Sequence, residues 1–410
     1  MESLLYLAHR IPYPPTKGDK IRSYHVLRFL AKRYRVYLGA FVDDPNDLEH
    51  LDALREWCAD VHLVPIDPRL AKLKSLVGLA TGEALTLPYY RHPSLQAWVE
   101  RTLRQQSIQK AVVFSAVMTQ YLAHASQVRL VADYCDVDSA KWMQYADEHR
   151  WPASWIYGRE GRRLLAFERE AAQRSVACVF ATRAECMLFE RLAPECAGQT
   201  HAIENGVDTD RFAPDALRAS PYAAGEAPIV FTGAMDYWPN IDAVTWFARE
   251  AWPLLLNERP DARFVIVGMN PAPAVQALAR ECPKVTVTGR VPDVRPYLQH
   301  ARAVVAPLRV ARGIQNKVLE AMAMARPVVV SSAAAHGISA QLGTDFESAA
   351  DATGYVRKLV PLLDPETGDA MGQRGRASVR ANYDWDRNLA RFETLLEAPE
   401  ANALSTMLTR

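Results

Sequence analysis

Short apolar runs recur along the chain, and each is long enough to form a buried β-strand. Most are unbroken stretches of valine, isoleucine and leucine without polar alternation, which is typical of strands covered on both faces. Such strands belong to the parallel sheets of α/β proteins. The expected strands are 3–8, 35–41, 61–66, 111–115, 130–133, 176–182, 229–232, 264–268, 285–289, 303–307 and 327–331.

Helical spacing separates these runs. After Asn240, a candidate N-cap, apolar residues follow at intervals of three or four between Ile241 and Leu255. The strands form two series, divided by the turn dipeptide Asn205-Gly206 and a proline-, serine- and alanine-containing stretch up to residue 225, which we interpret as a hinge or linker. Two doubly wound parallel sheets are the simplest architecture.

Length supports this division, because 410 residues exceed what one hydrophobic core usually holds. We expect an N-terminal domain over 1–205, a second domain over 206–387, and a closing helix and tail over 388–410. The tail has apolar residues at helical spacing (Leu389, Phe392, Leu395 and Leu396), and we expect it to pack back on the N-terminal domain.

Charge and cysteine content narrow the function. The formal net charge of +1 offers no global field for nucleic acid, so a charged ligand must be held locally. Six cysteines without a C-x-x-C pair favour a reducing, cytoplasmic setting. No apolar run approaches a membrane-spanning length, so contact with a membrane would be at its surface.

Several common catalytic motifs are missing. The sequence has no G-x-G-x-x-G or Walker loop, no G-x-S-x-G elbow and no H-E-x-x-H. Dehydrogenases, P-loop enzymes and zinc peptidases are therefore disfavoured. Twin α/β domains without these motifs predict a ligand in the cleft between them, at the carboxyl ends of the strands.

Four ordered segments of the second half resemble GT-B fold glycosyltransferases, especially glycosyltransferase family 4. They are Ile-Glu-Asn-Gly-Val-Asp at 203–208 followed by Phe212 and Pro214, the loop 232–240, Gly-Arg-Val-Pro-Asp-Val at 289–294, and 313–323. In the first half, 14–22 and 136–142 resemble the sugar transferases associated with the PEP-CTERM/exosortase system of Gram-negative bacteria. The resemblance implies two Rossmann-like domains facing across a cleft.

The resemblance and the chemistry of the residues together give the candidate site. A nucleotide-sugar donor has a diphosphate leaving group, whose growing charge lysine, arginine or a helix N-terminus can stabilise without metal. The catalytic candidates are Asp136, Lys317 and Arg312; the donor-binding candidates are Gly18, Gly233, Arg290, Val291, Asn316, Lys317 and Glu320; the acceptor-side candidates are Lys17, Arg22 and Asp133.

Glu320 has two acceptor oxygens, and the resemblance implies that they bind the ribose hydroxyls. Arg312 stands eight residues earlier, where the family has another glutamate. The loop 233–240 also lacks the arginine and lysine of many members. The negative charge of the phosphates would therefore be neutralised by Arg312 and Lys317, or by Lys17 and Arg22. Gly18 either lets the backbone approach the diphosphate or is a simple turn glycine.

Asp133, Asp136 and Asp138 follow an expected strand. A carboxylate there could orient or deprotonate an acceptor hydroxyl, and we assign this role to Asp136, whereas Asp138 fits an N-cap. No acidic pair stands beside the nucleotide segment, so we expect no metal cofactor. The pair Asp136–Asp138 lies on the acceptor side.

One segment, 70–90, combines lysines with leucines and tyrosines. It fits either a helix lying on an anionic membrane or a helix buried against the sheet. The first interpretation would bring the protein to a lipid-linked acceptor at the inner membrane.

These observations predict a glycosyltransferase that moves a sugar from a nucleotide-diphosphate sugar to a saccharide or polyprenyl-linked saccharide in exopolysaccharide assembly, with retention implied by the resemblance alone. Two alternatives stay open. One is a nucleotide-sugar 2-epimerase of similar fold, and the other is a silent nucleotide-sugar-binding partner, for which Arg312 in place of glutamate is the argument.

Overall fold

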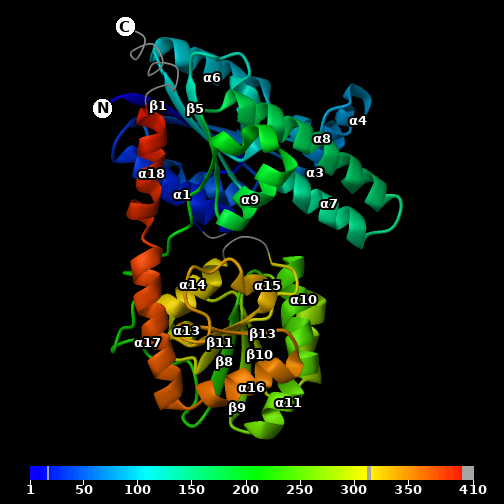
Figure 1. Ribbon diagram of the computed structural model, residues 1–410, viewed down its shortest axis with the longest axis vertical. Helices are drawn as coiled ribbons and strands as arrows, with labels where there is room; N and C mark the ends of the chain where they lie inside the picture. Colours follow the sequence, from blue (N-terminus) through cyan, green and yellow to red (C-terminus); the bar gives the residue numbers. More distant parts are fainter. Residues whose placement is uncertain (16–17, 312–314, 399–410) are drawn as a thin grey trace. The chain divides into compact units, whose positions relative to one another are not determined.

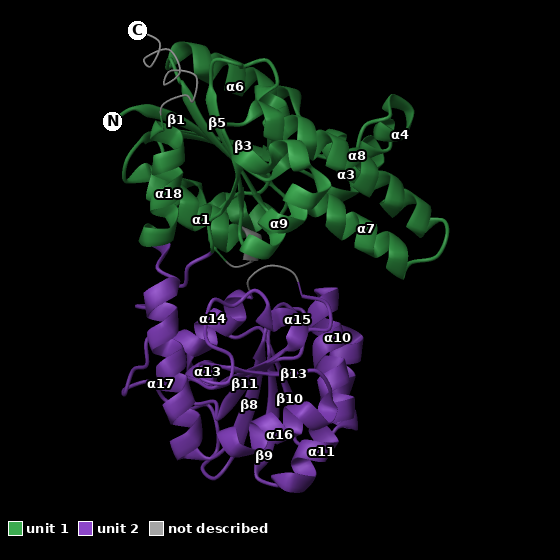
Figure 2. Cartoon of the chain, viewed as in Figure 1, with its two compact units in different colours: residues 1–204, 386–410 green, residues 205–385 purple. Residues whose placement is uncertain are grey.

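The computed structural model describes residues 1–15, 18–311 and 315–398 (Figure 1). It divides into two compact units, which Figure 2 colours separately. Unit 1 comprises Met1–Glu204 and Asp386–Arg410, and unit 2 comprises Asn205–Trp385. Each unit is an α/β body with its own parallel sheet, as the apolar runs predict.

Unit 1 has a seven-stranded sheet in the order β3-β2-β1-β4-β5-β6-β7, and every strand pairing in it is parallel. The order reverses between β1 and β4, as in doubly wound sheets. Its strands are β1 (Ser3–Ala8), β2 (Arg35–Val42), β3 (Asp60–Pro65), β4 (Lys110–Phe114), β5 (Arg129–Cys135), β6 (Ala177–Phe180) and β7 (Thr200–Ala202).

Helices lie on both faces of this sheet (Figure 1). They are α1 (Gly18–Ala31), α2 (Leu51–Arg55), α3 (Pro68–Ser75), α4 (Val77–Thr81), α5 (Thr86–Tyr89), α6 (Pro93–Gln105), α7 (Asp138–Glu148), α8 (Ala153–Arg174), α9 (Arg183–Leu192) and α18 (Trp385–Glu397), with 3-10 turns η1 (Pro45–His50), η2 (Ala116–Leu122) and η3 (Pro194–Gln199).

Unit 2 has a six-stranded parallel sheet in the order β10-β9-β8-β11-β12-β13. Its order reverses between β8 and β11. Its elements are β8 (Ala227–Thr232), α10 (Trp238–Trp246), the π-helical turn η4 (Phe247–Ala251), α11 (Trp252–Glu258), β9 (Ala262–Val267), α12 (Pro273–Glu281), β10 (Val285–Gly289), α13 (Arg295–Gln299), β11 (Ala303–Ala306), α14 (Asn316–Ala323), β12 (Val328–Ser331), α15 (Ser332–Ala335), β13 (Glu347–Ala349), α16 (Ala352–Leu362) and α17 (Pro365–Asn382).

Alternate residues of the unit 2 strands enter two different cores, one on each face of the sheet. In β8, for example, Ile229 and Phe231 pack into one core, and Val230 packs into the other. All three side chains have no exposed surface. This burial on both faces explains why the strand is apolar at every position.

The stretch 205–225, expected as a hinge or linker, packs on unit 2. Val207 and Phe212 are buried in one of its cores, and the Val207 amide donates to the Tyr383 carbonyl at 2.9 Å. A Cβ on Gly206 would overlap the ring and backbone of Trp385, so this position leaves no room for a side chain. The stretch is irregular in backbone but held in place by packing.

The closing helix α18 belongs to unit 1. Arg33 pairs with Glu393 at 3.0 Å, the Tyr34 hydroxyl donates to Glu397 at 2.7 Å, and Arg129 donates to the Leu395 carbonyl at 3.1 Å. Leu389 and Phe392 have no exposed surface. The apolar stripe read from the sequence is therefore the buried face of this helix.

Candidate functional site

The carboxyl ends of β8 and β9 in unit 2 lie against each other without intervening side chains. The Gly233 amide donates to the Val267 carbonyl at 3.0 Å, and the Gly268 amide donates to the Gly289 carbonyl at 3.3 Å. A Cβ on Gly268 would overlap the Gly233 carbonyl. Glycine is thus required for this close backbone approach, which forms the floor of the candidate site at the end of β8, one of the two strands between which the strand order reverses.

Lys317 in the first turn of α14 points at this floor. Its Nζ donates to Asn240 Oδ1 at 2.6 Å and lies 4.2 Å from the centroid of the Phe231 ring. A Cβ on Gly233 would stand 3.1 Å from the same Nζ. The structure therefore brings together Gly233 and Lys317, two of the predicted donor-binding residues, although 84 positions separate them in the sequence.

Asn240 is part of this arrangement in a way that the sequence analysis missed. We expected it to cap a helix, but α10 begins at Trp238. The side-chain Nδ2 of Asn240 donates to the Ala234 carbonyl at 2.9 Å, and its Oδ1 accepts from Lys317. The side chain therefore ties the loop after β8 to α14. The one indication in the sequence was that Asn240 ends the segment 232–240, which resembles a loop of GT-B glycosyltransferases.

The electrostatics of α14 are balanced between two partly buried groups of opposite charge. Burial lowers the pKa of Lys317 to about 7, and the attraction of Glu320 opposes this fall. Burial raises the pKa of Glu320 to about 7, opposed by the charges of Lys317 and then Arg211. An anionic ligand at Lys317 would stabilise the lysine's charge and raise its pKa again.

A buried hydroxyl also stands at the floor. Thr232, the last residue of β8, has an Oγ1 that is buried and finds no hydrogen-bond partner among the described residues. A buried polar group without a partner costs free energy unless a ligand or water satisfies it. This hydroxyl adds a polar atom to the end of the strand that precedes Gly233.

The other donor-side residues occupy different settings. Asn316 Oδ1 accepts from Asn205 Nδ2 at 3.4 Å, which joins the start of α14 to the first residue of unit 2. Arg290 is exposed after β10, whereas Val291 packs against the core beneath α14. Arg312 and the neighbouring Gly313 and Ile314 lie outside the described residues.

Arg22 and Asp133 in unit 1 are not open to a ligand. Arg22 Nε donates to Asp133 Oδ2 at 2.8 Å and its Nη2 donates to Oδ1 at 3.1 Å, while Nη1 donates to the Ile203 carbonyl at 2.8 Å. Neither side chain has exposed surface. Their expected contact with phosphate or acceptor is therefore corrected to a structural ion pair. Lys17 lies outside the described residues, and Gly18 is the first residue of α1.

Asp136 occupies an irregular turn after β5, where Cys135 has a positive φ of 64°. The Asp136 side chain is partly buried, and burial raises its pKa to about 6, opposed by Lys141 and reinforced by Glu185 and Asp138. A carboxyl group with a pKa in this range can exchange a proton near neutral pH.

Two buried glutamates hold the same turn. Glu185 Oε2 accepts from the Val137 amide at 2.8 Å, and the Glu168 carboxylate accepts from the Ser139 amide at 3.1 Å and from its hydroxyl at 2.5 Å. Asp138, expected as the N-cap, is the first residue of α7 and pairs with Lys141. The helix start is thus satisfied by carboxylates from α8 and α9.

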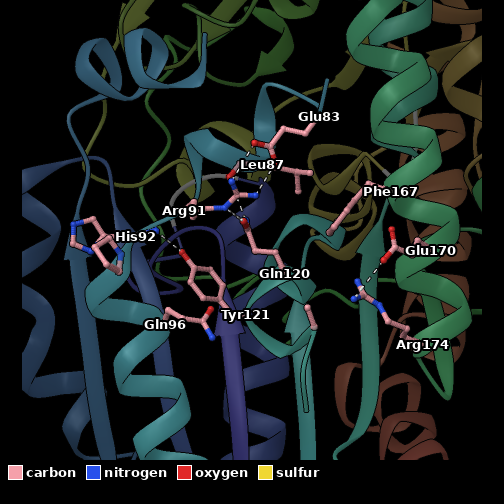
Figure 3. A pocket seen from close by; sticks show the side chains of 12 residues that line it. Glu83, Leu87, Arg91, His92, Gln96, Gln120, Tyr121, Phe167, Glu170 and Arg174 are labelled. Carbon is pink, nitrogen blue, oxygen red and sulfur yellow. Dashed lines mark hydrogen bonds and ion pairs between the residues drawn. The ribbon is translucent and has the colours of Figure 1, made fainter. Parts of the chain in front are cut away.

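A separate cavity of about 510 Å³ lies in unit 1 (Figure 3). Arg91 donates to both oxygens of Glu83, at 3.1 and 2.8 Å, and its Nε donates to Gln120 Oε1 at 3.1 Å. None of the catalytic, donor-binding or acceptor-side candidates lines this cavity. The lining residues are Glu83, Leu87, Arg91, His92, Pro93, Gln96, Gln120, Tyr121, Ala123, Phe167, Glu170 and Arg174.

Within the described residues, no group of three or more histidine, cysteine, aspartate or glutamate side chains could hold a metal ion. In the same part of the chain, no helix has the length and apolar character needed to cross a bilayer.

Comparisons with solved structures identify the fold. Sucrose-phosphate synthase (tll1590) from Thermosynechococcus elongatus is similar with a TM-score of 0.71 and 17% identity, covering 96% of this chain and 98% of that one. Anabaena Alr3699/HepE in complex with UDP gives a TM-score of 0.68 and 16% identity, covering 97% and 100%. The chain has the two-domain fold of GT-B glycosyltransferases.

Sequence comparison finds similarity over part of the chain. Residues 226–364 match the family model "Glycosyl transferases group 1". A GDP-mannose-dependent alpha-(1-6)-phosphatidylinositol monomannoside mannosyltransferase of Mycobacterium tuberculosis is 31% identical over 227 residues, 50% of this chain. The chain spans 57% of the length of that relative, and an enzyme of the same name from Mycolicibacterium smegmatis is 30% identical over 226 residues. The family match contains Gly233, Asn240, Lys317 and Glu320.

Proposed function

We propose that this protein is a glycosyltransferase that moves a sugar from a nucleotide-diphosphate sugar to a saccharide or polyprenyl-linked saccharide. The observation that carries the proposal is the contact of Lys317 with Asn240 over the glycine floor, inside the group 1 family match. A partly buried cation at the carboxyl ends of parallel strands is suited to a diphosphate.

The proposed chemistry uses charge in place of metal. When the bond between sugar and diphosphate breaks, negative charge grows on the diphosphate. Lys317 and the amide groups at the start of α14 would stabilise that charge, so we propose a reaction without a metal cofactor. Glu320 would accept hydrogen bonds from the ribose hydroxyls. Arg312 and Arg290 would place further positive charge near the diphosphate of the donor.

On the acceptor side, we propose that Asp136 orients or deprotonates the hydroxyl that attacks the sugar. Its pKa of about 6 supports this role, because a group near neutrality can accept and release a proton. We further propose that the reaction retains the anomeric configuration of the sugar. The protein would act at the cytoplasmic face of the membrane, in exopolysaccharide assembly linked to the PEP-CTERM/exosortase system.

The test has two stages. A thermal-shift screen of UDP-, GDP- and ADP-sugars first identifies the donor, because a ligand that binds only the folded protein raises its melting temperature. Release of nucleoside diphosphate is then measured with and without saccharide acceptors. We expect release that depends on acceptor and is at least about a hundredfold slower in Lys317→Ala. Conversion of the sugar without acceptor would indicate an epimerase, and binding without any turnover would indicate a silent partner.

A further inference from the structure

Exposed apolar side chains gather on two pieces of unit 1. Eight of the 17 large apolar residues that are exposed in the described residues fall within 70–79 and 151–156. Leu73 is 67% exposed, Trp151 81% and Trp155 54%. The eight are Leu70, Leu73, Leu76, Val77 and Leu79 from α3, α4 and the residue between them, and Trp151, Trp155 and Ile156 from the start of α8 and the turn before it.

Hydrogen bonds join these two pieces. Arg159 donates to the Gly78 carbonyl at 2.6 Å and to the Glu83 carbonyl at 3.1 Å, and Glu160 accepts from the amides of Leu85 and Thr86 at 2.6 and 2.9 Å. Residues four apart share one face of a helix.

Trp155 and Ile156 therefore extend the same face of α8 that binds α4 and the start of α5. Figure 1 shows α3, α4 and α8 as neighbours. We define the α3–α8 surface as these eight apolar side chains together with the exposed lysines and arginines of the same two segments.

The expected membrane segment 70–90 thus divides in two. In the first part, up to Leu79, the large apolar side chains are exposed, whereas Ala84 and Leu87 are buried in the core of unit 1. The membrane interpretation requires an exposed segment, which only the first part offers, whereas the burial of Ala84 and Leu87 agrees with a helix packed against the sheet.

The charges on the α3–α8 surface indicate which kind of partner it contacts. Residues 68–81 and 149–163 contain seven lysines and arginines, and Glu160 is their only acidic residue. Glu160 is buried and bound to α5. The exposed cations are Arg69, Lys72, Lys74, Arg150, Arg162 and Arg163.

Leucine and tryptophan among such cations match the chemistry of an anionic bilayer surface, where tryptophan lies at headgroup depth and lysine pairs with phosphate. The centre of a protein interface, in contrast, is depleted of charged residues, whereas six exposed cations stand among these apolar side chains.

We propose that the α3–α8 surface docks on a bilayer that contains anionic lipids. This inference deepens the proposed function. It rests on that function only in explaining why the protein would need to be near a lipid-linked acceptor. Docking itself needs neither donor nor acceptor, so it can be measured separately from transfer.

The experiment is cosedimentation of the full chain with vesicles of phosphatidylcholine alone or with phosphatidylglycerol added. We expect binding to the anionic vesicles only, and weaker binding as salt increases. Lys72→Glu with Lys74→Glu should weaken binding at least about tenfold, since each cation near an anionic surface contributes about 1 kcal/mol. Leu70→Ser with Leu73→Ser should also weaken it about tenfold, through lost apolar burial.

Matched controls lie in unit 2. Arg280→Glu with Arg357→Glu makes the same change in charge at exposed positions, and Leu217→Ser removes an apolar side chain that is 93% exposed. These variants should bind as the parent does. Equal losses in the controls, equal binding to neutral vesicles, or no binding would overturn the proposal.

The sedimentation velocity of the free protein tests the other occupant. A dimer that the Leu70→Ser, Leu73→Ser variant converts to a monomer would assign the surface to a second copy and would likewise overturn the proposal. Vesicle binding without transferase activity would instead reject only the proposed function.

Discussion

Arg22 and Asp133 form a bidentate ion pair with no exposed surface, at 2.8 and 3.1 Å. The pair links α1 to the end of β5, and the third contact of Arg22 reaches the Ile203 carbonyl beyond β7. One guanidinium therefore joins three segments that are far apart in the chain. Because Asp133 precedes the turn that contains Asp136, the pair also fixes the strand end from which the acceptor-side candidate projects.

Removal of one partner of this pair should strongly destabilise unit 1. Asp133→Ala leaves the Arg22 charge buried without its carboxylate, which typically costs about 3 to 5 kcal/mol. Chemical denaturation measures the loss. The control is Lys32→Ala at the exposed pair with Asp386, where the expected change is below about 1 kcal/mol. Equal effects of the two substitutions would contradict the structural role.

Glu320→Ala should weaken donor binding without unfolding the protein. It removes hydrogen bonds to ribose hydroxyls that contribute about 1.5 to 3 kcal/mol, because the acceptor is charged. Calorimetric titration with the donor identified by thermal shift gives the affinity. Unchanged affinity, with an unchanged melting temperature, would reject the ribose assignment.

Lys317→Ala should lower turnover more than donor affinity. Charge on the leaving diphosphate increases in the transition state, and loss of one such stabilising group typically costs about 10²- to 10³-fold in turnover. Steady-state kinetics at saturating donor measure the change, with Arg280→Ala on α12 as an exposed control. Full turnover at saturation, together with weaker binding of donor and free nucleoside alike, would contradict this role.

Donor affinity should depend on pH through Lys317. With a pKa of about 7, Lys317 is charged below that pH and binds the diphosphate best there, so its contribution decreases as pH rises, by at most about tenfold per pH unit for one proton. Glu320 ionises in the same range and acts in the opposite direction.

Glu320→Gln separates the two contributions. It removes the attraction that raises the pKa of Lys317, so the fall in affinity should move to lower pH. Titration with a nucleotide sugar, whose diphosphate does not ionise near pH 7, gives the profile. A Lys317→Met variant with the parent's profile would assign the pH dependence to another group.

Turnover should survive EDTA, because Lys317 and the start of α14 provide the positive charge that a metal would otherwise supply. Activity assays with chelator, then with Mg²⁺ or Mn²⁺ restored, measure this directly. Loss of activity in EDTA, rescue by Mn²⁺, and loss of metal binding in Asp136→Asn and Asp138→Asn would identify a metal-diphosphate site at that pair.

Apolar runs were sufficient to predict eleven of the described strands. Nine of them are largely buried and leave a continuous signal, and the edge strands β3 and β10 were found through their valines and leucine although each has one buried residue. The strands β7 and β13 were missed. Their sequences, Thr-His-Ala and Glu-Ser-Ala, are three residues long at sheet edges, and their apolar content is too small for such a signal. What places them is backbone pairing with a neighbouring strand, which composition does not record.

A residue of the candidate site could be predicted where its type, together with the segment in which it stands, indicates its role. It could not be predicted where the role depends on which other side chains it contacts in the folded chain. The resemblance marked Gly233 and Lys317 as donor-binding candidates, and the structure places them side by side. Arg22 and Asp133, however, are suitable for ligand binding by residue type, and only their pairing across 111 positions excludes it. The use of Glu168 and Glu185 to hold the start of α7 is equally a property of tertiary contacts.

The return of α18 to unit 1 makes unit 2 an insertion within the chain. Its two ends are adjacent, since Val207 bonds to Tyr383, and the flanking ends of unit 1 are adjacent too, since Asn388 Nδ2 donates to the Glu204 carbonyl at 3.4 Å. Unit 2 can therefore be excised as one continuous piece, and the cut ends of unit 1 can be rejoined by a short graft. A fragment that simply ends at Glu204, by contrast, would lack α18, which packs on unit 1. Exchange of donor specificity between homologues by swapping 205–385 would preserve every contact that α18 makes with unit 1.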